Sequence, residues 1–321
     1  MSKIKHKTTL TIGFVADPLE NFDLQNETTL FLMHEATRRG WGCDHFELQD
    51  LFVKGTTPHA LARQVIVKQC KRGFSYTVSD RREINLTRMH ALFLRKDPPV
   101  DVNFIDHLTI LELLNNKVLM VNNPAGIKLA NEKILPLHFK GITPRTLVSK
   151  ATQLICQFVR NEKTAILKVL NQAGGRGVIK VRADDTSLNA IIETLTHQQN
   201  RFIMAQQYLP EAIKGDKRIL LLNGEILGAF VRVPSKKDFR GNLHSGARIT
   251  ATTITKRDRE IVHTIKDKLH EMQLYFVGID IIGGHCTEIN TTSPMGIGEV
   301  NTLYQRRLEK NVMDWVAQQI S

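Results

Sequence analysis

One stretch of the chain decides its fold: Phe276-Val-Gly-Ile-Asp280-Ile-Ile-Gly-Gly-His-Cys-Thr-Glu288-Ile-Asn290-Thr-Thr-Ser293-Pro294. Two β-rich runs, 275–282 and 286–291, flank a short glycine-rich connection, and this pattern predicts a hairpin. If the loop consists of residues 283–285, Asp280 lies opposite Glu288. The two-residue period of a strand then puts Asn290 on the same face as Glu288.

These three polar side chains stand in otherwise apolar strands, where an acidic pair is costly to bury without cations. Carboxylate and amide oxygens suit Mg²⁺, which proteins hold with one or two carboxylates plus substrate phosphates. We therefore expect Asp280, Glu288 and Asn290 to bind metal. The alternative is a solvent-facing hairpin with ordinary polar positions.

Composition places the chain among ordinary globular proteins. Its 321 residues are 42% hydrophobic and 24% charged, and the length predicts two or three packed subdomains. No apolar run reaches the roughly 18 residues of a membrane span. The cysteines form no CxxC pair, which favours a reducing cytoplasm over a zinc site or disulfides: Cys43, Cys70, Cys156 and Cys286. Cys286 could be a nucleophile, but without a nearby base in the sequence a packed thiol is favoured.

The net charge of +12 comes from 44 basic and 32 acidic residues, which raises nucleic-acid binding as a hypothesis. However, the basic residues are spread over the whole chain, and aromatic residues make up only 6% of it. The charge fits small polyanions such as nucleotides better than RNA or DNA.

Strands and helices alternate over about residues 8–125, which predicts a parallel α/β layer. The part at 54–83 is less regular and carries many charges, and a strand pair is one arrangement open to it. A small antiparallel sheet follows, with strands at 146–148, 165–169 and 178–182. The third unit is predicted to hold strands 204–208, 218–222 and 225–233, the hairpin, and a helix at 256–272. The predicted domains are therefore an N-terminal α/β domain at 1–127, a small lid subdomain at 128–200 and a C-terminal subdomain at 201–321.

Two common nucleotide-binding motifs are absent from the sequence, namely the P-loop and the G-x-G-x-x-G turn after the first strand. Instead, Lys168 ends a predicted strand and is followed by the loop Gly174-Gly175-Arg176-Gly177 and a returning strand. Glycines in such a loop let the backbone fold over phosphates. A plain hairpin turn is the alternative.

Several blocks together resemble the ATP-grasp ligases, and most closely the prokaryotic glutathione synthetase family: the lysine and glycine flap, Asn131-Glu132-Lys133, Ala205-Gln206-Gln207-Tyr208-Leu209-Pro210, Gly215-Asp216-Lys217-Arg218, Leu94-Arg95-Lys96-Asp97-Pro98-Pro99, Arg240-Gly241-Asn242-Leu243 and the acidic hairpin. The resemblance covers essentially the whole chain in the expected order. It implies an α/β protein, with an ATP-grasp fold preceded by an N-terminal α/β (pre-ATP-grasp) domain.

The resemblance also implies roles for individual residues. Those expected to bind ATP are Lys133, Lys168, Gly174, Gly175, Gln206, Gln207, Tyr208, Leu209 and Asp216. Those expected to act on the transferred phosphate and the acyl group are Arg218, Arg232, Asn290 and Arg240. Those expected on the substrate side are Arg95, Lys96, Asn242, Arg248 and Ser293. For Arg95 and Lys96, a charged turn is the alternative.

The implied reaction is the joining of γ-glutamylcysteine and glycine through an acyl-phosphate, with ATP as co-substrate and two Mg²⁺ ions (Mn²⁺ being an alternative). Bringing a carboxylate to a triphosphate costs roughly 4 kcal/mol for each like-charge pair at about 4 Å. Metal ions, Lys and Arg offset that repulsion. The acyl-phosphate must also be kept from water, so the loop 235–248 is expected to close over it. The resemblance further implies a homo-oligomer, small-molecule substrates and no membrane partner.

Departures from the family pattern gather on the substrate side. The chain has Gln25-Asn26-Glu27 where the family has lysines, Asn171-Gln172 where it has Asp-Gly, and Met295–Val300 without the usual Arg. Two alternatives to glutathione synthesis therefore stay open. One is a paralogous ligase with a different acid or amine, and the other is a nucleotide- or RNA-binding protein without catalysis.

Overall fold

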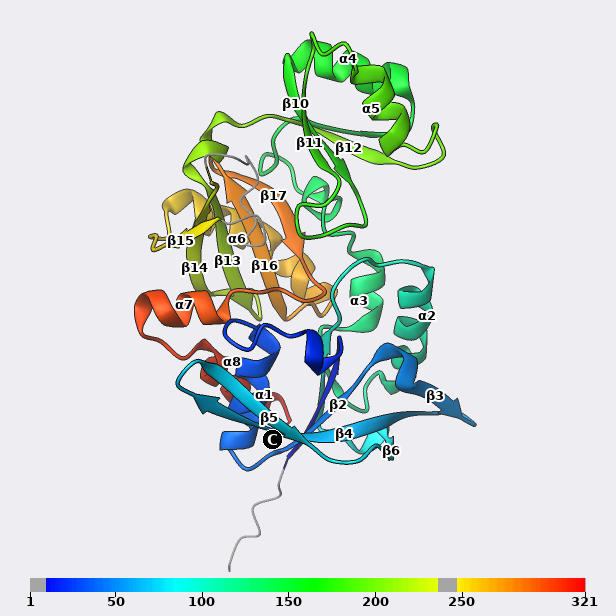
Figure 1. Ribbon diagram of the computed structural model, residues 1–321, viewed down its shortest axis with the longest axis vertical. Helices are drawn as coiled ribbons and strands as arrows, with labels where there is room; N and C mark the ends of the chain where they lie inside the picture. Colours follow the sequence, from blue (N-terminus) through cyan, green and yellow to red (C-terminus); the bar gives the residue numbers. More distant parts are fainter. Residues whose placement is uncertain (1–9, 236–246, 321) are drawn as a thin grey trace, which may run out of the picture.

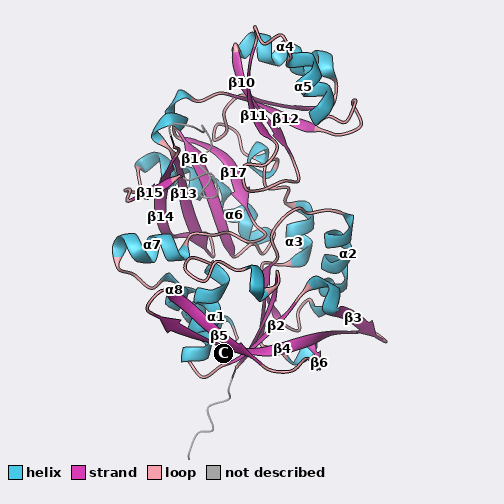
Figure 2. Cartoon of the chain, in the orientation of Figure 1, coloured by secondary structure: helices cyan, strands magenta, loops and turns pink. Residues whose placement is uncertain are grey.

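The computed structural model describes residues 10–235 and 247–320. Three β-sheets follow one another along the long axis of the molecule, and helices flank each of them (Figures 1 and 2). The eight-stranded sheet belongs to the N-terminal part, the five-stranded sheet lies in the middle, and the four-stranded sheet is at the far end.

The N-terminal sheet has the strand order β3-β4-β2-β1-β7-β8, with β5 and β6 paired to β4. Its strands are β1 (Thr11–Ala16), β2 (Gly42–Phe46), β3 (Leu51–Lys54), β4 (Thr57–Cys70), β5 (Gly73–Val78), β6 (Arg82–Asn85), β7 (Ala91–Arg95) and β8 (Leu119–Val121). The helices beside it are α1 (Thr28–Arg38), α2 (Val102–Leu111) and α3 (Pro124–Leu129). Short 3₁₀ turns complete the chain at 19–21, 48–50, 86–88, 112–114, 135–138 and 210–214.

Only part of this sheet is parallel. β1 pairs in parallel with β2 and β7, and β7 with β8, as predicted. The strand pair considered for 54–83 is present, since β4 and β5 pair antiparallel. The segment is more regular than expected, because the long strand β4 also pairs antiparallel with β2, β3 and β6. Most of the charged residues of this segment are exposed, and several of them, such as Lys71, Arg72 and Asp80, lie in the turns between these strands.

The four-stranded sheet is antiparallel, with the order β11-β10-β12-β9. It consists of β9 (Thr146–Ser149), β10 (Thr164–Val169), β11 (Val178–Arg182) and β12 (Ile203–Gln207), beside helices α4 (Thr152–Glu162) and α5 (Leu188–Leu195). The sequence places strand 204–208 in the third unit, and this is wrong, because β12 pairs with β9 and β10. Periodicity identifies a strand but not the sheet it joins. The domain boundaries stay a prediction, and a boundary after Gln207 fits this pairing.

The five-stranded sheet is antiparallel, with the order β15-β14-β13-β16-β17. It contains β13 (Asp216–Leu222), β14 (Glu225–Val233), β15 (Arg248–Thr250), β16 (Phe276–Ile282) and β17 (His285–Asn290), with helices α6 (Lys256–Glu271), α7 (Ile297–Tyr304) and α8 (Leu308–Gln319). A capping box begins α6, in which Thr255 and Asp258 each accept a hydrogen bond from the other's backbone N–H.

Two hydrophobic cores join the N-terminal sheet to the five-stranded sheet, whereas the four-stranded sheet and its helices have a separate core. Polar contacts strengthen the junction. The buried Asn122 donates to the carbonyls of Phe276 (2.8 Å) and Thr291 (2.7 Å), and its own oxygen accepts from Phe276 N–H at 2.8 Å. The first and last helices are joined by an ion pair between Arg39 and Asp314 (2.7 Å). The ends of β16 and β17 are therefore held by the N-terminal part of the chain.

Candidate active site

The acidic hairpin has the predicted pairing but a different turn. The connection consists of two residues, Gly283 and Gly284, both with positive φ (+55° and +77°), as a tight hairpin turn requires. Ile281 then pairs with Cys286. A β-bulge between this pair and the next one along the hairpin brings Asp280 opposite Glu288. The predicted three-residue loop is wrong, yet the register it implied is correct. The bulge supplies the extra residue that the turn lacks.

Asp280 is buried and held by two arginines. Its carboxylate accepts from Arg218 Nε at 2.6 Å and pairs with a terminal nitrogen of Arg232 at 3.0 Å. Burial alone would raise the pKa of Asp280, but the two guanidinium groups outweigh it and lower the pKa to about 2. The carboxylate is therefore ionised at every physiological pH. Arg218 and Arg232, both expected to act on the transferred phosphate, lie beside it.

Asp216, expected near the ribose, lies on the same sheet and is engaged by Arg232. The two Asp216 oxygens accept from Arg232 at 2.7 and 2.8 Å, a bidentate arrangement. Burial raises the pKa of Asp216, although Arg232 opposes the shift. Arg232 thus bridges Asp216 and Asp280, which fixes its guanidinium between the two carboxylates.

Glu288 faces Lys133, which comes from the segment after α3. The Lys133 ammonium lies 3.0 Å from Glu288 Oε1 and also donates to the backbone carbonyl of Gln172, in the loop between β10 and β11. Glu288 is the more accessible of the two hairpin carboxylates, with 22% of its side chain exposed. Asn290 donates to the carbonyl of Gly278 at 3.2 Å. One lysine therefore joins the hairpin to the glycine-containing loop.

The residue before this lysine, Glu132, is a buried anchor to which the sequence assigned no role. Its Oε1 accepts from the backbone N–H groups of Thr291 (2.8 Å) and Thr292 (3.1 Å) and from the Thr292 hydroxyl (3.0 Å). Its backbone carbonyl accepts from Ile289 N–H at 2.9 Å. Burial and the nearby Glu288 carboxylate raise its pKa. Glu132 thereby ties the Lys133 segment to the end of the hairpin.

Lys168 lies at the end of β10, as predicted, and is buried against the neighbouring strand. Its ammonium donates to Gln206 Oε1 at 2.7 Å, and Gln206 Nε2 donates to the Thr146 hydroxyl at 3.1 Å. Burial lowers the pKa of Lys168, while the carboxylate of Glu288 opposes the shift. Lys168 and Lys133 thus lie close to the same hairpin carboxylate.

The glycine-rich loop between β10 and β11 is present. Gly174, Gly175 and Gly177 all have φ near +70° (+72°, +71° and +66°). At Gly177 a side chain is excluded as well, because an added Cβ would lie 2.8 Å from Gln172 Oε1. Asn171, one of the departures from the family pattern, accepts from Asn131 Nδ2 at 3.1 Å. The loop is therefore held to the Lys133 segment through the residues that differ.

The expected nucleotide hinge follows β12. Gln207 N–H donates to the carbonyl of Arg145 at 2.9 Å, and Tyr208 carries the Lys180 ammonium 3.7 Å from the centre of its ring. Leu209 is buried. Both contacts are made to the four-stranded unit, and the segment leads from β12 of that unit to β13 of the five-stranded sheet.

On the substrate side, Arg95 is 2% exposed and is engaged by protein groups. It donates to the carbonyl of Pro294 at 3.0 Å and to the Thr29 hydroxyl at 3.2 Å. Burial lowers its pKa. Lys96 pairs with Asp17 at 2.7 Å. Arg95 thus joins β7 and α1 to the segment after the hairpin, which contains Ser293.

The remaining predicted residues fall at or beyond the edge of this region. Arg248 is exposed at the start of β15. Arg240 and Asn242 lie outside the described residues. Cys286 is buried, and burial raises the pKa of its thiol to about 12, which agrees with a packed side chain.

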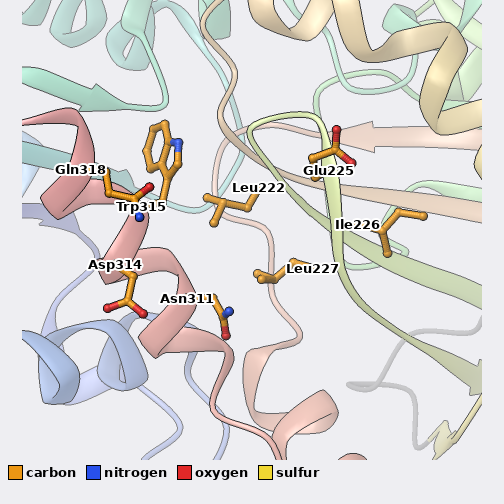
Figure 3. A pocket seen from close by; sticks show the side chains of 8 residues that line it. All are labelled: Leu222, Glu225, Ile226, Leu227, Asn311, Asp314, Trp315 and Gln318. Carbon is orange, nitrogen blue, oxygen red and sulfur yellow. The ribbon is translucent and has the colours of Figure 1, made fainter.

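A hollow of about 330 Å³ lies away from this site, between the β13–β14 turn and α8 (Figure 3). Leu222, Glu225 and Trp315 line it. None of the predicted site residues takes part in it. Of the helices in the part of the chain that the structure describes, none is long and apolar enough to cross a membrane.

Comparison with known proteins agrees with the geometry. The model described as prokaryotic glutathione synthetase, N-terminal domain, matches residues 10–128, and the model described as prokaryotic glutathione synthetase, ATP-grasp domain, matches residues 132–305. The chain belongs to the prokaryotic glutathione synthetase family. It is therefore an ATP-dependent ligase, and the predicted ATP-grasp fold with an N-terminal α/β domain is confirmed.

Individual relatives of the prokaryotic glutathione synthetase family match over nearly their full length. The glutathione synthetase of Thermosynechococcus vestitus is 38% identical over 318 residues, covering 96% of this chain and 99% of the relative. That of Yersinia pestis is 37% identical over 297 residues, covering 92% and 93%.

Solved structures with low sequence identity share the fold. The ATP-grasp ligase PsnB complexed with minimal precursor has a TM-score of 0.63 and 16% identity, covering 97% of this chain and 99% of that chain. The D-alanyl-alanine synthetase A of Vibrio cholerae has a TM-score of 0.60 and 13% identity, covering 98% and 99%.

Proposed function

We propose that this chain is a glutathione synthetase that joins γ-glutamylcysteine to glycine, with conversion of ATP to ADP and phosphate. The observation that carries the proposal is the convergence of Lys133 and Lys168 on a hairpin whose two carboxylates face each other. Such a set of charges suits a triphosphate with its cations. The glutathione synthetase relatives support the choice of substrates.

The cations of the site have carboxylate or amide partners that a nucleotide could replace. Lys133 rests on Glu288, and Lys168 rests on Gln206. We assign both lysines to the phosphates of ATP, under the loop with Gly174 and Gly175. A lysine already held at the site loses less conformational freedom when it binds phosphate, which strengthens binding.

The hairpin residues fit Mg²⁺. Among the described residues, no three or more His, Cys, Asp or Glu side chains gather into a metal site. Asp280, Glu288 and Asn290 would therefore share the ions with substrate phosphates, the usual arrangement for Mg²⁺. Bound there, two ions would neutralise phosphate charge in the transition state. The low pKa of Asp280 keeps one ligand ionised without any metal.

The other residues are assigned by their positions. Gln206, Gln207, Tyr208, Leu209 and Asp216 would surround the nucleoside. Arg218 and Arg232, fixed by Asp280, would stabilise negative charge on the transferred phosphoryl group and the acyl oxygen. On the substrate side we assign Arg95, Lys96, Arg248, Ser293 and, outside the described residues, Arg240 and Asn242.

One observation favours a different acid or amine as a second candidate. Gly298 stands where the family usually has an arginine, and a Cβ there would lie 2.9 Å from the ring of Phe31. Glu27 caps α1 through Thr29 N–H (2.9 Å), where the family has lysines nearby. Two cationic positions of the family are thus absent from the segments assigned to the substrate side, and their loss would alter the preferred substrate.

The proposal also covers the cellular compartment and the oligomeric state of the enzyme. Four free cysteines favour the reducing cytoplasm. A homo-oligomer is proposed from the family resemblance alone, and light scattering of the pure protein would measure its mass.

The test is phosphate release by the pure protein with Mg-ATP and γ-glutamylcysteine, with and without glycine. Release that requires both substrates would support glutathione synthesis. Release only with another acid or amine would support the second candidate. Stabilisation by an oligonucleotide, but not by Mg-ADP, would contradict both.

A further inference from the structure

Lys168 is the end of a short chain of side-chain hydrogen bonds that begins on β9. The Thr146 hydroxyl donates to the carbonyl of Pro144 at 2.9 Å. Its oxygen accepts from Gln206 Nε2 at 3.1 Å, and Gln206 Oε1 accepts from the Lys168 ammonium at 2.7 Å. Gln206 is 4% exposed, so protein groups rather than bulk water set the orientation of its amide.

The direction of each bond follows from the one before it. The Thr146 hydroxyl has one proton, and Pro144 offers only an acceptor, so the Thr146 oxygen is left to accept. The Gln206 group facing it must then be the donor, which is the NH₂. The amide oxygen consequently points to the other side, toward Lys168. An ammonium can only donate, so this is the one orientation that holds it.

Without the hydroxyl, the bond from Lys168 is the only contact in this chain that distinguishes the two ends of the amide, and the buried NH₂ group of Gln206 is left without its acceptor. A rotated amide would direct its NH₂ toward Lys168, and two donors would face each other. The lysine would then leave the position it occupies beside β12. The threonine thus acts on the lysine through two successive hydrogen bonds.

We propose that Thr146 is a positioning residue for nucleotide binding: it fixes the Gln206 amide and thereby places the Lys168 ammonium for the phosphates of ATP. This inference rests on the proposed function, in which Lys168 contacts those phosphates. Thr146 itself touches no reacting group.

Replacing the hydroxyl should leave the fold intact. Thr146 lies on the edge strand β9, and its backbone pairs with Gln206 whatever its side chain. Thr146→Val keeps the β-branched shape and removes only the polar atom. Thr146→Ser restores the hydroxyl. Thr164→Val, on strand β10 of the same sheet, is the matched control, since no side-chain hydrogen bond of Thr164 occurs among the described residues.

The experiment measures Mg-ADP affinity by calorimetry and the KM for ATP and kcat by phosphate release. For Thr146→Val we expect Kd and KM to rise on the order of tenfold, with kcat within about twofold of wild type, since a contact made equally in the ground and transition states changes KM alone. Thr146→Ser should recover most of the affinity, and Thr164→Val should match wild type.

A second pair of variants tests the route of the effect. In a Gln206→Met background, Thr146→Val should have no further effect, because the amide it orients is gone. Additive losses would overturn the proposal, as would equal affinities of wild type and Thr146→Val, or equal losses in the Val and Ser variants. A wild-type protein that binds no Mg-ADP would overturn the proposed function together with the inference. If wild type binds Mg-ADP, the results from the variants test the inference alone.

Discussion

Glu132 gives the sharpest test of how this site is built. Its single oxygen Oε1 holds Thr291 N–H, Thr292 N–H and the Thr292 hydroxyl, at 2.8, 3.1 and 3.0 Å. We predict that Glu132→Ala loses much of both stability and ligase activity, whereas Glu132→Gln retains most of both. The glutamine keeps an oxygen in the same place and removes only the charge.

The magnitude follows from the groups left behind. Thr291 and Thr292 are 0% and 3% exposed, so water does not replace the lost acceptor. An unsatisfied buried donor costs about 1–3 kcal/mol, and two are backbone N–H groups that cannot turn away. We expect Glu132→Ala to lower the free energy of unfolding by about 3–5 kcal/mol. For Glu132→Gln we expect about 1 kcal/mol, because burial already raises the pKa of the carboxyl and so disfavours its charge.

The assay combines thermal unfolding with Mg-ATP-dependent phosphate release. A loss of about 3 kcal/mol corresponds to a fall in Tm of roughly 4–6 °C in a chain of 321 residues. Glu271→Ala is the control, since 67% of that side chain is exposed and its ion pair with Lys268 lies on the surface, where it contributes little. A Glu132→Ala protein with the same Tm as wild type would refute the anchoring role. Equal losses in the Ala and Gln variants would show that charge, and not hydrogen bonding, is what matters.

Two further predictions concern the hairpin. Glu288→Gln should reduce phosphate release at least about 100-fold while Tm stays within about 2 °C, because the side chain is partly exposed and its shape is kept; turnover at the wild-type rate would rule out the metal assignment. Asp280 has a pKa of about 2 in the folded protein, against about 3.9 in an unfolded chain. Its contribution to stability, about 2 kcal/mol, is therefore complete above roughly pH 5 and is lost as the pH falls through 4 toward 2. Urea unfolding of wild type and Asp280→Asn measures this between pH 5 and 2.5. The difference between their free energies of unfolding should shrink as the pH falls, and a difference that stays constant with pH would contradict the prediction.

The hairpin shows how far sequence reasoning reaches. Alternation of apolar and polar residues identified both strands and the facing of Asp280 and Glu288, because the burial of one face fixes the register. It missed the bulge, since a longer loop and a tight turn followed by a bulge give the same pairing beyond that point. Only the positive φ of Gly283 and Gly284 tells them apart.

Other parts of the site had no local signal. Glu132 and Thr292 are 160 residues apart, and Thr146 and Gln206 are 60 apart, so no spacing in the chain could join them. The two arginines that pair with Asp280 lie on two other strands, β13 and β14, so no local pattern in the sequence could join them to it either. Lys168 and the glycine-rich loop were recognised from a local pattern, a lysine at a strand end followed by glycines, whereas Lys133 was marked only by the family resemblance.

The separate core of the four-stranded sheet has a consequence for motion. The apolar side chains that it buries, such as Ile155, Leu167 and Ile203, pack on one another within that unit. Turning the unit as a rigid body would therefore expose none of the apolar surface that joins the other two sheets. One polar link that such a rotation would strain is the hydrogen bond from Lys133 to the carbonyl of Gln172. In the proposed function, an incoming triphosphate would compete for that same lysine, so nucleotide binding and rotation of this unit would be coupled through Lys133.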